Sequence, residues 1–187
     1  MTAITRAWLS FAAIGAGVIH LALVISSPLA IGIPLVLFGI AELTWGALIL
    51  VKDRLLLPRL AQAGAITPLL LWSLLTVTVT LLAAPQIASS LRFLPMGIAA
   101  IFELFIAGVL SVILRRQAET ETETEPPTPV SKPATAVKYL CAVIIAGVLV
   151  GALTTPALAA TQAGAVAIEH GGTMGGMMTI NVPGMGH

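Results

Sequence analysis

Charged residues are scarce in this sequence. Only 9% of its 187 residues are Asp, Glu, Lys or Arg, whereas soluble domains contain about 25%. The formal net charge is +1, so the chain has no strong positive field that would attract DNA or RNA. The composition therefore disfavours a soluble enzyme, a nucleic-acid-binding protein and a disordered interaction protein.

Recognisable catalytic motifs are absent as well. The single cysteine, Cys141, allows no intramolecular disulfide framework. The sequence contains no phosphate-binding loop, dinucleotide fingerprint, Gly-x-Ser-x-Gly elbow or His-Glu-x2-His motif. The only aspartate, Asp53, lies in a basic turn. We therefore expect a protein that is not an enzyme.

Apolar residues, by contrast, are abundant. They make up 58% of the chain, and the mean hydropathy is +1.04. A helix needs about 20 mainly apolar residues to cross the hydrocarbon core of a bilayer. Five stretches satisfy this requirement, and we predict an all-α membrane protein with five transmembrane helices at about 7–25, 31–51, 60–84, 95–114 and 138–159.

The basic residues predict an orientation in the plasma membrane. If the N-terminus is cytoplasmic, one basic residue, Arg92, lies in an external segment. Cytoplasmic segments are enriched in Lys and Arg, so we predict that the N-terminus is inside and the C-terminus outside. The cytoplasmic segments then hold Arg6, Lys52, Arg54, Arg59, Arg115, Arg116, Lys132 and Lys138.

The distribution of charge and proline divides the chain into four parts. Residues 1–116 are predicted to form a four-helix transmembrane unit. Residues 117–137 contain glutamates alternating with threonine and then several prolines, which predicts a disordered cytoplasmic linker. A separate fifth span at 138–159 and a disordered extracytoplasmic tail at 160–187 follow.

Two processing hypotheses compete with this organisation. Residues 1–30 resemble a signal peptide, but His20 interrupts the apolar core and Pro28 is poorly placed for cleavage after Ala30. The small residues that end at Ala159 resemble a second cleavage site. We favour an ordinary last span there.

Spans two and four share a short pattern. Pro34-x7-Glu42-Leu43 matches Pro95-x7-Glu103-Leu104 at an offset of 61 residues. The match suggests two helix pairs of equal orientation related by duplication.

Three ionisable side chains lie near the middle of the predicted spans: His20, Glu42 and Glu103. A charge at the bilayer centre costs about 2.5–3.5 kcal/mol on insertion scales, so such residues normally face the bundle interior. They are candidates for a buried proton or cation site. The alternative, which we favour from sequence alone, is that each Glu hydrogen-bonds a neighbouring helix and only fixes packing.

In span five, Gly147-x3-Gly151 predicts close packing against another helix of this chain or of a partner.

The tail is rich in methionine and histidine, with candidate ligands at His170, Met174, Met177, Met178, Met185 and His187. Thioether and imidazole groups suit copper, above all Cu(I). Met also supplies soft sulfur outside the cytoplasm without forming disulfides. A flexible tail, or one that docks its methionines on a partner, explains the same composition.

Residues 154–164 and the tail that follows resemble the ends of small uncharacterised actinobacterial multi-pass membrane proteins. The resemblance implies a plasma-membrane location and an exposed His-bearing tail. Such tails are usually richer in His, and the Met found here favours copper over zinc or nickel.

Three functional hypotheses follow from the sequence. The first is non-enzymatic binding or delivery of copper by the tail, beside a membrane partner. The second is a metal-independent accessory subunit of a larger membrane complex, such as a respiratory oxidase. The third is a small proton- or cation-coupled transporter that uses Glu42 and Glu103. We expect contact with the lipid bilayer, a membrane protein partner or a second copy of the chain, and no nucleic acid.

Overall fold

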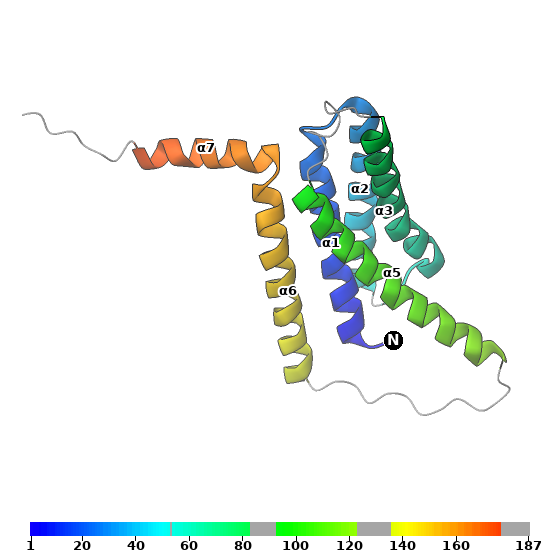
Figure 1. Cartoon of the computed structure of the whole chain (residues 1–187). Coiled ribbons are helices and arrows are strands. Elements are labelled where there is room, and N and C mark those ends of the chain that lie inside the picture. The colour runs from blue at the N-terminus through cyan, green and yellow to red at the C-terminus, as the bar shows by residue number, and fades with distance from the viewer. Residues whose placement is uncertain (53, 83–92, 123–135, 177–187) are drawn as a thin grey trace, which may run out of the picture.

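The computed structural model describes residues 1–52, 54–82, 93–122 and 136–176, with only the backbone described at 120–122 and 170–176. These residues form helices and contain no strand (Figure 1). The helices are α1 (Ala3–Val24), α2 (Leu29–Lys52), α3 (Pro58–Leu81), α5 (Phe93–Thr122), α6 (Ala136–Ala159) and α7 (Gln162–Gly176).

The prediction of five spans is confirmed to this extent: α1, α2, α3, α5 and α6 are each long and apolar enough to cross a membrane. The predicted boundaries also hold approximately. Span one begins earlier than predicted because the side chain of Thr2 accepts a hydrogen bond from the backbone N–H of Thr5 and caps α1 at Ala3.

The beginning of the predicted linker is helical. We predicted disorder from residue 117, but α5 continues to Thr122. Residues 115–119 are Arg, Arg, Gln, Ala and Glu, all strong helix formers, and they allow the helix to continue beyond its apolar part. The remaining prediction of a linker, at 123–135, lies outside the described residues.

The prediction of a disordered tail is wrong for residues 162–176, which form α7. Thr161 caps this helix, because its hydroxyl accepts a hydrogen bond from the backbone N–H of Gly164 at 3.2 Å. A Cβ at Gly164 would collide with the carbonyl oxygen of Leu158, so this tight turn requires glycine. Figure 1 shows that α7 runs away from the other helices at a steep angle to α6.

Helix α1 occupies the centre of the fold. It contacts α2, α5 and α6, and α3 packs mainly against α5 (Figure 1). More than half of the apolar window of α1 is buried, whereas no more than a third of the corresponding window is buried in each of the other spans. Because no soluble protein could leave so much apolar surface uncovered, the exposed faces fit contact with lipid.

Helix α6 packs against α1 and α5, although the sequence predicted a span apart from the four-helix unit. Its contact face includes Ala146 and Ala157, which are fully buried, and Val150, which packs against the core. The predicted packing pair lies elsewhere: no atom of any other described helix lies within 4 Å of a Cβ built at Gly147 or Gly151. Among the described residues, α6 therefore does not use this pair for close packing.

Glycine brings α1 and α2 together. A Cβ at Gly17 would lie 2.8 Å from the carbonyl oxygen of Gly39, and a Cβ at Gly39 would lie 3.0 Å from that of Gly17. Farther along the same interface, the hydroxyl of Ser10 donates a hydrogen bond to the carbonyl oxygen of Gly46 at 2.7 Å. Small residues allow helix backbones to approach closely in membranes, and here they set the spacing of the two helices.

We expect Gly17→Ala to destabilise the protein by about 1–3 kcal/mol, the usual cost of overpacking. The new methyl group would meet backbone of α2, which cannot move aside as a flexible side chain can. Reversible unfolding in detergent measures the change. Gly147→Ala is the matched control, because open space surrounds it, and it should leave stability unchanged or slightly raised. Equal stability of the two variants would contradict the role of Gly17.

Candidate functional site

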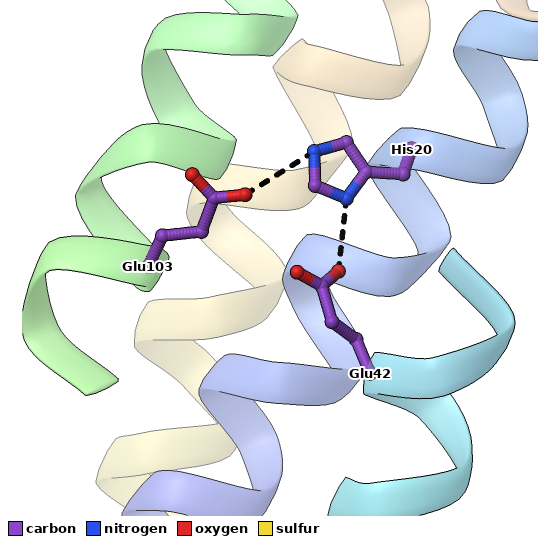
Figure 2. A network of polar contacts seen from close by, with 3 residues as sticks. All are labelled: His20, Glu42 and Glu103. Atoms are coloured by element: carbon purple, nitrogen blue, oxygen red, sulfur yellow. Dashed lines mark hydrogen bonds and ion pairs between the residues drawn. The ribbon is translucent and has the colours of Figure 1, made fainter. Parts of the chain in front are cut away.

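The structure brings together the three ionisable residues of the spans. His20 lies on α1, Glu42 on α2 and Glu103 on α5 (Figure 2). His20 and Glu42 each follow, by three residues, one of the glycines at which α1 and α2 meet. Positions three apart share a helix face, so the close approach of the two helices also brings these side chains together.

The imidazole of His20 lies between the two carboxyl groups (Figure 2). Its Nδ1 is 2.9 Å from Oε2 of Glu42 and hydrogen-bonds it, while its Nε2 is 3.3 Å from Oε1 of Glu103. The side chains of His20 and Glu103 are 0% and 2% exposed, and that of Glu42 is 12% exposed. Both ring nitrogens therefore face a carboxyl oxygen, in a site that is buried at His20 and Glu103 and slightly exposed at Glu42.

The hydrogen bonding of the site is incomplete. Nε2 of His20 and Oε1 of Glu103 are near each other but lack hydrogen-bond geometry, and neither has another hydrogen-bond partner in the described chain. Oε1 of Glu42 is likewise buried without a hydrogen-bond partner among the described residues. Buried polar atoms are normally paired, so three unpaired atoms in one cluster indicate a place for a proton, a water molecule or a cation.

An apolar cavity lies next to this site. Its volume is about 340 Å³, and residues of α1, α2, α3 and α5 line it. Phe38 lies between the cavity and the cluster: it lines the cavity, and its ring centroid is 6.5 Å from that of His20. Sequence reasoning missed Phe38, since one aromatic residue in an apolar span has no distinguishing pattern.

The Pro-x7-Glu-Leu pattern shared by spans two and four supplies both carboxyl groups of the site. Glu42 and Glu103 occupy equivalent places in the repeated pattern, and both carboxyl groups face the same imidazole. The repeat does not extend to the histidine, because the position 61 residues after His20 is Leu81. The site is therefore asymmetric, with two carboxyl groups and one imidazole.

The predicted copper ligands are not brought together in the part of the chain that is described. His170 and Met174 lie within α7, where only the backbone is described. The other four, Met177, Met178, Met185 and His187, lie outside the described residues. The copper hypothesis stays a prediction from sequence.

A hydrogen bond between side chains of α3 and α5 was also missed by sequence reasoning. The side-chain amide of Gln62 on α3 donates a hydrogen bond to the hydroxyl of Ser111 on α5 at 2.7 Å. Ser111 in turn donates to the carbonyl oxygen of Ala107 in its own helix at 2.7 Å. Neutral, hydrogen-bonded groups of this kind serve packing, and they offer a control for experiments on the charged site.

Comparison with known proteins adds no assignment: no family model, no curated protein and no solved structure matches this chain. Fold and site define an all-helical protein with five helices able to span a membrane and a buried His–Glu–Glu cluster among three of them.

We expect the three side chains to depend on one another for stability. His20→Leu should destabilise the protein by about 3–5 kcal/mol, because it leaves buried carboxyl groups without their partner. Replacing His20, Glu42 and Glu103 together with leucine should cost much less, since no buried polar group would remain unpaired. Unfolding free energies of both variants in detergent test this. A triple variant less stable than His20→Leu would contradict the proposed coupling.

Proposed function

We propose that this protein is a small proton- or cation-coupled membrane transporter whose ion-binding site is the cluster of His20, Glu42 and Glu103. One observation carries the proposal: the two ring nitrogens of a fully buried histidine face two carboxyl groups from different helices. Ionisable residues inside membrane spans commonly mark ion pathways and proton relays. Helices can pack through neutral hydrogen-bonded side chains, as Gln62 and Ser111 do between α3 and α5, so packing alone does not require an ionisable cluster.

The charge of the cluster favours binding of positive ions. With both carboxyl groups ionised and the imidazole neutral, the cluster carries two negative charges within an apolar bundle. Removing such charges from water is costly unless they are neutralised. Two protons, or one doubly charged cation, would neutralise the cluster completely.

The imidazole is suited to passing a proton between the two carboxyl groups. When Nε2 accepts a proton from the side of Glu103, the ring can release the proton on Nδ1 to Oε2 of Glu42, which is 2.9 Å away. The ring returns to the neutral form, and one proton has moved from one helix interface to the other. Histidine performs such transfers because its two nitrogens can exchange the roles of donor and acceptor.

The orientation and location inferred from the sequence belong to this proposal. We place the N-terminus in the cytoplasm and the C-terminus outside the plasma membrane, on the distribution of Lys and Arg. Copper binding by the tail and a role as an accessory subunit remain alternatives. Copper stoichiometry of the purified full chain separates these two.

Proton flux into liposomes tests the proposal. Liposomes that contain the protein and a pH-sensitive dye are given a pH gradient, with and without divalent cations on the opposite side. We expect flux above that of protein-free liposomes, and we expect Glu103→Gln to lower it to that level, because the amide can carry no exchangeable charge.

Ser111→Ala is the matched control. It removes a hydrogen bond between α3 and α5 but no ionisable group, so flux should persist. Flux that is unchanged by Glu103→Gln, or absent from the wild-type protein under both conditions, would refute the transporter hypothesis.

A further inference from the structure

The geometry points to a divalent transition-metal ion as the cation that this site accepts, with Nε2 of His20 and Oε1 of Glu103 as ligands and Glu42 holding the imidazole in place. This inference rests on the proposed function and names its ion. Three features of the cluster carry it: the separation of the two ligand atoms, the partner of the other ring nitrogen, and the charge.

The separation of the ligand atoms fits an ion and disfavours a direct hydrogen bond. Nε2 and Oε1 are 3.3 Å apart without hydrogen-bond geometry (Figure 2). With metal–ligand bonds of about 2.1 Å, an ion between these atoms would make an N–metal–O angle of about 100°, between octahedral and tetrahedral values. The positions of Nε2 and Oε1 therefore do not suit a direct hydrogen bond, but they suit two bonds to one metal ion.

The other ring nitrogen has the partner expected of a metal-binding histidine. Histidine ligands usually donate the N–H of their second nitrogen to a carboxylate, which fixes the tautomer and orients the ring. Nδ1 of His20 makes this contact with Oε2 of Glu42 at 2.9 Å. Glu42 is thus a positioning residue in this arrangement, and Nε2 is left with its lone pair toward Glu103.

Charge and ligand type select the class of ion. One doubly charged cation balances the two carboxylates, and its entry releases the two protons that otherwise neutralise the cluster, so the exchange is electroneutral. An imidazole nitrogen favours ions such as Zn²⁺, Fe²⁺ or Ni²⁺ over Mg²⁺ and Ca²⁺, which prefer oxygen ligands. Structural zinc sites are closed by four protein ligands. Two ligands leave coordination positions open, as an exchangeable ion requires.

Co²⁺ and Zn²⁺ are suitable probes, because Co²⁺ reports its ligands by visible absorption and Zn²⁺ competes for the same site. The titration uses the full chain in detergent, freed of metal, with His170→Ala and His187→Ala in every sample to remove tail imidazoles. We expect one Co²⁺ per chain with absorption bands typical of nitrogen and oxygen ligands, displaced by Zn²⁺. Ser111→Ala should bind identically.

The variants separate ligands from the positioning residue. Glu103→Gln, which removes a charged ligand, should weaken Co²⁺ binding and shift its absorption bands. Glu42→Leu should weaken binding about 10- to 100-fold, the usual effect of losing such a partner. Glu42→Gln should bind more tightly than Glu42→Leu but more weakly than the chain with Glu42, because the amide oxygen can still accept the Nδ1 hydrogen but one of the two negative charges is lost. A merely structural role of Glu42 would change thermal stability without this partial recovery.

The outcomes distinguish this inference from the proposed function. No Co²⁺ or Zn²⁺ binding by a folded chain that keeps His20, Glu42 and Glu103, or binding that Glu103→Gln leaves unchanged, would overturn the metal site. If proton flux still depended on Glu103 in that case, the transporter hypothesis would stand with the proton as its ion. Metal binding without flux would support the site and refute transport.

Discussion

An ionisable side chain inside a membrane bundle must find its polar partner within the protein, because lipid offers none. In this chain His20 meets that requirement for both Glu42 and Glu103, and α1, α2 and α5 must all lie close enough for one imidazole to reach two carboxyl groups. The central place of α1 and its contacts with both other helices satisfy this constraint. The arrangement of the spans and the chemistry of the cluster thus depend on the same three side chains.

Glycine makes this arrangement geometrically possible. The backbones of α1 and α2 approach so closely at Gly17 and Gly39 that a methyl group on either would meet backbone of the other helix. One turn along each helix the same interface carries a histidine and a glutamate. The energy gained by close packing between α1 and α2 therefore also holds Nδ1 of His20 against Glu42. On the side of α5, glycine of α1 meets a side chain and not backbone: a Cβ at Gly15 would lie 2.9 Å from Cε2 of Phe102. The contact between His20 and Glu103 on this side lacks hydrogen-bond geometry.

The limits of sequence reasoning are clearest at the helix ends and in the packing of α6. The end of α5 was predicted too early because repelling glutamates were weighted above strong helix formers. The helix at Gln162–Gly176 was missed because abundant glycine suggested a flexible chain, whereas Thr161 caps the helix and Gly164 permits the tight turn before it. The Gly147–Gly151 pair predicted close packing, yet α6 contacts its neighbours through Ala146, Val150 and Ala157. Small-residue motifs recur by chance in glycine-rich spans, so they do not choose a face.

The sequence by itself determined the number of helices able to span a membrane, because it contains five apolar stretches of about 20 residues or more, the length that such a helix needs. It also singled out His20, Glu42 and Glu103, since ionisable residues are costly in such helices. It left open whether these residues meet, and it favoured packing as their role. Only the tertiary structure decided that they converge, because contact between residues 22 and 83 positions apart depends on how helices pack and not on local pattern.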